Sequence, residues 1–393
     1  MNAKEFIRDY CKRKMHFANL NDLDLFQRFA TNGLIQSITF DPKELKKRTL
    51  EFIKLCHVDD FRYKFAPSSK APCLYASCYA IMLKGLLEEK LEKCGWIEFF
   101  NSYQSSKDGL FYDPELECDE FTTQGKWGDG WGINHLTAHI CIAYGRLNDS
   151  PKFPFIFLEP FYSLSYLDKW LEKFNFINNL WKQSNYIMNL YSCLQFARDW
   201  QNEKRAQLAI DHIGDWLLKH QNPSTGLWHE KKDLNIEESW DAIRAAYHYY
   251  PLFVYDRKSI PNVENLSRYI MSLQNSLGAF TFEGRDSGAC EDIDACEPML
   301  RFAPSELRNE ISISIRKLLV WYLGCWQNDG GFSFYLDNSH QYGGHPLTSS
   351  LRHEGSMLGT WFRLLGIGYI LDYLGNDNPI HMGHFPGYEI SLK

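Results

Sequence analysis

The sequence lacks any pair of cysteines at CxxC spacing, although eleven cysteines are scattered through its 393 residues. This pattern argues against a zinc ribbon and against a dithiol redox site. The chain also shows no recognisable signal peptide and no apolar run long enough to span a bilayer. Because isolated cysteines are typical of a reducing compartment, we predict a cytoplasmic protein without an integral membrane segment.

Clusters of basic residues are missing as well. The chain carries 42 Lys and Arg against 49 Asp and Glu, which gives a formal net charge of −7, and it has no Lys/Arg-rich run. Without a positive field, binding to nucleic acid is not expected, and we predict a small-molecule substrate instead. Aromatic residues, in contrast, make up 16% of the chain, enough to build a large core and also to line a cavity.

A degenerate repeat runs through the chain. Each copy ends an amphipathic helix with a glutamine, continues through a polar turn with glycine, and then has an aromatic residue. The copies are "FFNSYQSSKDGLF" (99–111), "WLLKHQNPSTGLW" (216–228), "YIMSLQNSLGAF" (269–280) and "YLGCWQNDGGF" (322–332). Glycine just past a helix supplies the left-handed residue of a C-cap, so we interpret these segments as structural staples and not as ligand contacts.

More apolar stretches with small residues alternate with the amphipathic ones. They lie at residues 71–87, 131–147, 184–200, 238–253, 291–303 and 354–370. Strand-like alternation is scarce, so we predict an all-α protein. Six apolar helices can form an inner ring that amphipathic helices surround. The pattern therefore predicts a single (α/α)6 toroid over residues 41–393, with residues 1–40 as an N-terminal extension.

In such a ring the N-termini of the inner helices gather at one mouth, where their dipoles add positive potential. Polar and aromatic side chains concentrate at the predicted starts of these helices. The candidates for chemistry or substrate binding are Trp127, Trp131, His135, Trp240, Asp241, Arg244, Glu291, Asp292, Asp294, His345, Arg352, His353 and Trp361. Acids, imidazoles, arginines and tryptophans around an apolar cavity are the usual components of an acid/base site.

Local structural roles can explain part of this set. Asp294 and Glu297 have the spacing of a capping box at a helix start. In the preceding inner helix, Ser239 can act as the cap, which leaves Asp241 and Arg244 as an i,i+3 ion pair. His135 can equally be a hydrogen-bonded core histidine.

Glu291 and Asp292 precede the predicted cap and need another explanation. A carboxyl group beside other acids, and over an apolar cavity, holds its proton at neutral pH. Such a group is a strong general acid, and His135, His345 or His353 can hydrogen-bond it or serve as the base.

The repeat resembles the QW repeats of squalene cyclases and related class II terpenoid cyclases. "EDIDAC" (291–296) resembles their Asp-x-Asp-Asp motif, whose middle aspartate protonates an alkene or epoxide. The resemblance implies a cofactor-independent cyclase or isomerase with Asp294 as proton donor, and with Asp292 and Glu291 tuning it. The last aspartate of the motif is replaced here by Ala295, which puts that role in question.

The same superfamily includes the protein prenyltransferase β subunits, whose zinc site uses Asp-x-Cys and a downstream His. Asp294 and Cys296 match that short motif, and His353 is the histidine that the resemblance implies. A zinc site of Asp294, Cys296 and His353 is therefore a minor alternative to a metal-free enzyme.

Two further alternatives stay open at this stage. Other all-α toroids are glycoside hydrolases, uronate lyases or sugar epimerases, and here Asp241 with Asp292 or Asp294 would form the carboxylate pair. The tryptophans would stack on sugar rings, and Arg244, Arg352 and Arg363 would bind a substrate carboxylate or phosphate. The third alternative is a catalytically silent toroid that binds a partner or glycan at its mouth. The sequence indicates no oligomeric state.

Overall fold

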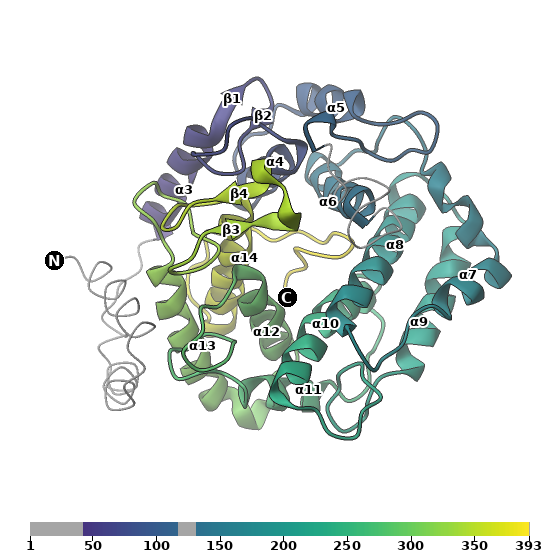
Figure 1. The fold of residues 1–393 in the computed structure, drawn as a ribbon, viewed down its shortest axis with the longest axis vertical. Helices are drawn as coiled ribbons and strands as arrows, with labels where there is room; N and C mark the ends of the chain where they lie inside the picture. Colours follow the sequence, from purple (N-terminus) through teal and green to yellow (C-terminus); the bar gives the residue numbers. More distant parts are fainter. Residues whose placement is uncertain (1–41, 117–130, 393) are drawn as a thin grey trace.

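The computed structural model describes residues 42–116 and 131–392, and it is helical through almost all of its length (Figure 1). In these ranges, strands are limited to two short antiparallel pairs. They are β1 (His57–Asp59) with β2 (Arg62–Tyr63), and β3 (His340–Gln341) with β4 (Ser349–Ser350). The all-α prediction is confirmed. The predicted extension at residues 1–40 and the candidate Trp127 lie outside the described residues.

Six helices form a closed cycle of contacts around the centre of the molecule (Figure 1). They are α4 (Leu74–Leu86), α6 (Trp131–Leu147), α8 (Leu180–Trp200), α10 (Ile236–Tyr255), α12 (Ala289–Arg301) and α14 (Met357–Leu374). Each packs against the next, and α14 packs against α4. These helices match the six apolar stretches of the sequence, with ends shifted by up to four residues.

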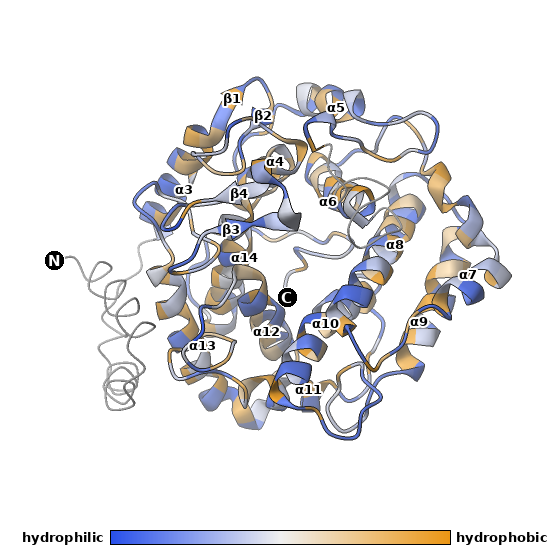
Figure 2. Cartoon of the chain, viewed as in Figure 1, coloured by the Kyte–Doolittle hydropathy of each residue, from blue (hydrophilic) through white to orange (hydrophobic). Residues whose placement is uncertain are grey.

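The remaining helices alternate with these six along the chain and lie at the periphery. They are α3 (Pro42–Cys56), α5 (Lys93–Ser102), α7 (Leu164–Leu171), α9 (Ala206–Lys219), α11 (Val263–Met271) and α13 (Arg308–Gly324). Short 3-10 turns are η1 (Pro114–Leu116), η2 (Ile156–Tyr162), η3 (Ser305–Leu307), η4 (Tyr342–Gly344) and η5 (Pro346–Thr348). Figure 2 shows hydrophilic and hydrophobic residues mixed on α7 and α9, as expected for helices with one face in water. No helix in the described ranges is long and apolar enough to cross a membrane.

The repeat has the structural role that its sequence predicts. In the second copy, the side-chain amide of Gln221 donates to the carbonyl of Gly226 (2.9 Å) and closes the turn after α9. The same bond joins Gln104 to Gly109 (3.0 Å) and Gln274 to Gly278 (2.7 Å). Each of the four repeat turns contains a glycine with positive φ, namely Gly109, Gly226, Gly278 and Gly330. Since L-residues avoid this conformation, the glycines are required by the turn itself.

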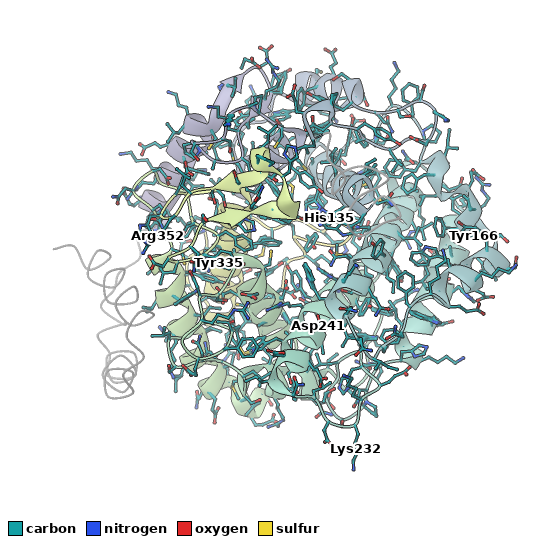
Figure 3. The ribbon with its side chains drawn as sticks, in the orientation of Figure 1. His135, Tyr166, Lys232, Asp241, Tyr335 and Arg352 are labelled. Carbon is teal, nitrogen blue, oxygen red and sulfur yellow. The ribbon has the colours of Figure 1, made fainter. Side chains whose placement is uncertain are left out.

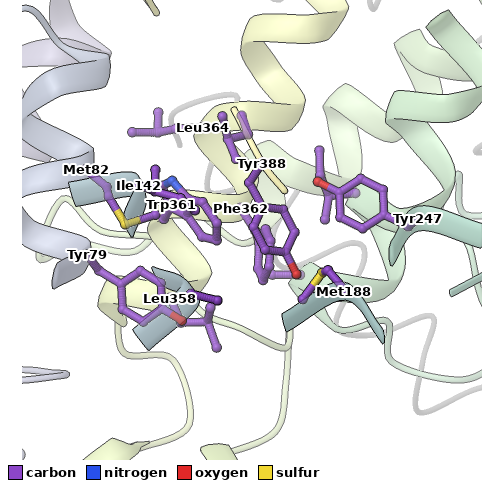
Figure 4. Close-up of a cluster of buried hydrophobic side chains, with 14 of the residues drawn as sticks. Tyr79, Met82, Ile142, Met188, Tyr247, Leu358, Trp361, Phe362, Leu364 and Tyr388 are labelled. Atoms are coloured by element: carbon purple, nitrogen blue, oxygen red, sulfur yellow. The ribbon is translucent and has the colours of Figure 1, made fainter. Parts of the chain in front are cut away.

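Aromatic and aliphatic side chains fill the centre of the ring below the site described next (Figure 4). Tyr79, Met188, Tyr247 and Trp361 meet there from four inner helices, together with Tyr388 of the C-terminal segment. This packing makes the centre of the ring a core and leaves a cavity on one side of it.

The C-terminal segment is held in the ring by a buried carboxylate. The Trp361 indole N–H donates to Glu389 (2.6 Å), and the Arg146 guanidinium forms an ion pair with the same side chain (2.6 Å). Because these groups come from α14, α6 and the C-terminal segment, the ion pair ties the end of the chain to two inner helices. This attachment places Tyr388 at the wall of the cavity.

Candidate functional site

A cavity of about 250 Å³, here called the central cavity, opens among the N-terminal halves of the inner helices. Helices α6, α8, α10 and α12 form its walls, residues 340–343 cover it, and Phe362 and Tyr388 close it toward the core. Its titratable lining residues other than tyrosine and cysteine are His135, His139, His248, His340, Arg244, Glu291 and Asp294. Its aromatic lining residues are Trp131, Trp181, Phe334, Tyr335, Tyr342, Phe362 and Tyr388.

Helix α12 begins earlier than the sequence predicted. Its first residue is Ala289, and the Glu291 carboxylate accepts the N–H of Gly288 (2.7 Å), as the third residue of a helix does in a capping box. The predicted Asp294–Glu297 capping box is therefore wrong, because both residues lie inside the helix and are buried. Glu291, which lacked a structural explanation, is the residue that caps.

Asp294 is a buried carboxyl group without a partner. Its residue is 2% exposed, it lines the central cavity, and its Oδ2 has no hydrogen-bond partner within the described structure. Burial raises the pKa of Asp294 well above its usual range; nearby Arg244 opposes the shift, and Glu291 and Asp292 add to it. Burial therefore favours the neutral carboxylic acid form of Asp294, the form that can give up a proton.

Asp292, only two residues away, has a different environment. Its carboxylate accepts from the Arg363 guanidinium (2.8 Å), from the Ser287 hydroxyl (2.7 Å) and from the N–H of Phe280 (3.1 Å). Asp292 and Arg363 are both fully buried, and neither lines the central cavity. We call this pair, with Ser287, the Asp292–Arg363 anchor. It joins α12 to α14 and leaves no free oxygen for acid catalysis, although the charge still acts on Asp294.

Asp241 is also committed to structure. Its two carboxylate oxygens accept the N–H groups of Leu180 (2.7 Å) and Trp181 (3.2 Å), so α10 caps the start of its neighbour α8. The predicted Asp241–Arg244 pair is wrong, because Arg244 forms an ion pair with Glu291 across the α10–α12 contact. Asp241 does not line the central cavity, and the paired carboxylates of a glycosidase are not assembled from it.

The cap of α10 also differs from the prediction. Asn235 accepts the N–H of Glu238 (2.9 Å), and the Glu238 carboxylate accepts the N–H of Asn235 (3.0 Å), which together form a complete capping box. Ser239, the predicted cap, lies inside the first turn and donates back to the carbonyl of Asn235 (2.8 Å). The N-cap is thus Asn235, four residues before the predicted Ser239.

Two cavity histidines are arranged as neutral bases. The Ser184 hydroxyl donates to the carbonyl of Trp181 (2.7 Å), so it accepts from Nδ1–H of His248 (2.7 Å), which leaves Nε2 of His248 unprotonated. In the same way, Nδ1–H of His139 donates to the carbonyl of His135 (2.9 Å). Burial lowers the pKa of His248 to about 3 and that of His139 to about 4.

The remaining cavity histidines are also buried and neutral. His135 meets the hydroxyl groups of Tyr75 (2.8 Å) and Tyr342 (3.1 Å), and burial, with a smaller contribution from His139, lowers its pKa well below the usual range. His340 stacks on Phe334 with ring centroids 3.6 Å apart, and burial lowers its pKa to about 3. The cavity therefore combines one neutral acid with several neutral imidazoles.

Sequence reasoning missed several lining residues. His248 follows Arg244 by four positions, so both lie on one helix face, and this spacing was the signal that could have revealed it. His340, Tyr342 and Tyr388 had no such signal, because a hairpin and the C-terminal segment bring them to the cavity from outside the helix repeat.

Arg352 and His353 lie away from the central cavity. Both bind the buried carboxylate of Asp337, Arg352 through two contacts of 2.7 Å and His353 at 2.6 Å. Figure 3 shows Arg352 near the periphery of the molecule and His135 near its centre. The predicted roles of Arg352 in substrate binding and of His353 as a catalytic partner are thus not supported by their positions.

The other predicted aromatic and imidazole groups divide between cavity and core. Trp131 lines the central cavity and packs on His135, with ring centroids 4.8 Å apart. Trp361 is fully buried, and Trp240, one turn before Arg244 on α10, is buried against Phe280 and does not line the central cavity. His345 accepts the N–H of Leu347 (3.1 Å) and caps a short turn. Of the predicted set, the structure thus brings Trp131, His135, Arg244, Glu291 and Asp294 together.

The three residues predicted as zinc ligands, Asp294, Cys296 and His353, do not form a metal site in this structure. Cys296 is buried among apolar side chains, and that burial raises the pKa of its thiol, which disfavours the thiolate that zinc needs. His353 is bound to Asp337, as described above. Across residues 42–116 and 131–392, no three His, Cys, Asp or Glu side chains are grouped to hold a metal ion.

No protein-family model and no curated protein matches this sequence. One solved structure, a crystal structure of a protein from Actinoplanes, aligns with 85% of this chain and with all of its own, at a TM-score of 0.44 and 12% sequence identity.

Proposed function

We propose that the protein is an enzyme built on a single (α/α)6 toroid, in which Asp294 donates a proton to a small substrate in the central cavity. The observation that carries this proposal is the position of Asp294 in the cavity wall, where it is buried and its Oδ2 has no hydrogen-bond partner within the described residues. Burial raises the pKa of this carboxyl group well above its usual range, which favours the protonated form. A protonated carboxyl group in a dry cavity is a strong donor when a substrate can accept its proton.

The same cavity offers acceptors for a returning proton. Nε2 of His248 has a free lone pair, because the ring proton is on Nδ1, which donates a hydrogen bond to the Ser184 hydroxyl oxygen. His139 has the same tautomer, because its Nδ1–H donates a hydrogen bond to the carbonyl oxygen of His135. Donor and acceptor together support an isomerisation, cyclisation or elimination, in which one proton enters the substrate and another leaves. This chemistry involves no net redox change and requires no cofactor.

The aromatic walls favour a terpenoid-cyclase-like reaction as the first candidate. Trp131, Phe362 and Tyr388 present ring faces or edges to the cavity, and aromatic faces stabilise cations. Asp294 also occupies the position that the resemblance to class II terpenoid cyclases gives to the proton donor. A cavity of about 250 Å³ is smaller than most ligand pockets, which favours a short isoprenoid over squalene.

The polar lining favours a second candidate, a sugar epimerase or uronate lyase. Arg244 lies on the cavity wall beside Glu291, and a hydrocarbon substrate could not form hydrogen bonds or ion pairs with either side chain. Several neutral histidines on the cavity wall can hydrogen-bond the hydroxyl groups of a sugar. A glycoside hydrolase is disfavoured, because the carboxylates of Asp241 and Asp292 bind backbone N–H groups and Arg363.

The test compares Asp294→Asn with Glu297→Gln, a buried acid on the same helix that does not line the cavity. Both variants are assayed with prenyl diphosphates, squalene, monosaccharides and acidic oligosaccharides. For the substrate that the wild type converts, Asp294→Asn should lower turnover by about 10²–10⁴-fold, and Glu297→Gln by much less. Equal turnover of wild type and Asp294→Asn would remove Asp294 from the mechanism.

A spectroscopic measurement tests the protonation state without a substrate. Infrared difference spectra at neutral pH should show the carbonyl stretch of a protonated carboxyl group in the wild type and in Glu297→Gln, and its loss in Asp294→Asn. No change in that band between wild type and Asp294→Asn would mean that Asp294 is ionised. In that case the proposed donor is wrong whatever the substrate. A confirmed band with no turnover of any substrate would favour the third alternative, a toroid that only binds.

A further inference from the structure

A second and larger cavity, here called the side pocket, lies on the outer side of α6 and α8. Its volume is about 440 Å³, and it is bounded by α6, η2, α7 and α8. It is separate from the central cavity, because the two share no lining residue. On α6, Ile133 and Asn134 face the side pocket, whereas Trp131 and His135 face the central cavity.

Asn189 of α8 lines the side pocket with an unsatisfied carboxamide. The residue is 2% exposed, and neither its Nδ2 nor its Oδ1 has a hydrogen-bond partner among residues 42–116 and 131–392. Asn185, one turn earlier, is satisfied by contrast, since its Nδ2 donates to the carbonyl of Trp181 (2.8 Å). A buried amide without any partner is rare, because its desolvation is not compensated. This cost has an explanation if a ligand supplies both partners.

Aromatic rings line the same pocket as Asn189. Phe161 packs edge-on against Tyr166, at 5.3 Å and 85°, and against Trp170, at 5.5 Å and 89°. Together with Phe157 these residues form an aromatic cage. Figure 3 shows Tyr166 at the outer edge of the molecule, so the pocket is reached from the surface. Faces and edges arranged in this way accept a flat ring.

We propose that the side pocket binds a planar aromatic ligand that carries a carboxamide or an equivalent adjacent donor and acceptor. The ring would pack in the cage of Phe161, Tyr166 and Trp170. The amide edge would pair with Asn189, whose Nδ2 donates and whose Oδ1 accepts, in the two-point geometry that asparagine uses toward a base edge. This binding site is independent of the reaction proposed for the central cavity.

The test uses benzamide as the probe and the full chain as the protein. Binding is measured by saturation-transfer NMR and by quenching of tryptophan fluorescence, for wild type, Asn189→Leu and Asp294→Asn. We expect benzamide to bind the wild type and Asp294→Asn equally, and Asn189→Leu about tenfold more weakly, which corresponds to the loss of about 1.4 kcal/mol. Toluene, which lacks the amide, should not distinguish Asn189→Leu from the wild type.

The variant is also expected to fold. Leucine has nearly the same shape as asparagine, and its burial removes an unsatisfied polar group, so Asn189→Leu should melt a few degrees above the wild type. Equal affinity of benzamide for wild type and Asn189→Leu, or no binding of benzamide to the wild type at millimolar concentration, overturns the proposal. Weaker binding to Asp294→Asn would place the probe in the central cavity and would overturn it as well.

Discussion

Asp292 and Asp294 are the same residue type on the same helix, and both are buried, yet their surroundings are opposite. Two residues along an α-helix are about 200° apart, so the two side chains leave α12 on different faces. Asp292 meets a guanidinium, a hydroxyl and a backbone N–H in the Asp292–Arg363 anchor, whereas Asp294 meets the central cavity. The residues that surround each carboxyl group, and not the residue type, therefore determine that Asp292 anchors α12 to α14 and that Asp294 favours its protonated form.

The largest effect on stability should come from breaking the anchor. Asp292→Asn leaves the fully buried Arg363 without its counter-charge, and we expect a loss of about 3–5 kcal/mol in the free energy of unfolding. Urea denaturation at neutral pH measures this loss. Combining Asp292→Asn with Arg363→Met should recover part of it, because the unpaired charge is then gone. Similar unfolding midpoints for Asp292→Asn and Asp294→Asn would contradict the comparison.

A smaller effect is expected from the histidine side of the central cavity. The folded-state pKa of His139 is about 4, below its usual 6.5, so acidification protonates the unfolded chain first. The stability that neutral His139 contributes is fully present above pH 6.5 and is lost as the pH falls toward about 4. The size of this loss is about 3 kcal/mol. His139→Gln should reduce this pH dependence in urea titrations at pH 7 and pH 4.5, and an unchanged dependence would mean that the ring is solvated.

Asp241 extends the comparison to a second structural acid. Removing its two hydrogen bonds to the start of α8 by Asp241→Ala should cost about 1–2 kcal/mol, as loss of a helix cap does. Asp233→Ala, at an exposed position just before α10, is the matched control and should change little. Turnover should fall far less in Asp241→Ala than in Asp294→Asn, and the opposite order would show that Asp241 takes part in chemistry.

The smallest effect on stability is expected from Asp294→Asn at acidic pH. Below about pH 4 both side chains are neutral, so the free energies of unfolding should agree within about 1 kcal/mol. Since folding raises the pKa of Asp294, the wild type loses stability as the pH rises above the pKa of the unfolded carboxyl, and the variant does not. Between pH 4 and pH 7 the melting temperature of Asp294→Asn should therefore rise relative to that of the wild type. If the two melting temperatures change with pH in parallel, Asp294 has an ordinary pKa.

The incorrect predictions of helix caps and ion pairs share one physical cause. Asp294 and Glu297 have cap spacing, but so do Gly288 and Glu291, and the helix begins at the earlier pair. Spacing alone cannot choose between two overlapping caps, because the choice depends on what the rest of the helix packs against. Likewise, Asp241 and Arg244 are suitably spaced for an ion pair, yet each finds its partner on a neighbouring helix.

The helices, their alternation between apolar and amphipathic, and the left-handed glycines of the repeat could all be predicted from the sequence. These features follow from local periodicity and backbone sterics, which act over a few residues. It also indicated that α12 carries the acids. The pairing of Asp292 with Arg363, and the absence of a partner for Oδ2 of Asp294 within the described residues, follow from how the helices pack. The same packing brings His248, His340 and Tyr388 to the cavity. Those outcomes depend on contacts between residues tens to hundreds of positions apart, where burial and the partner's charge set the protonation state.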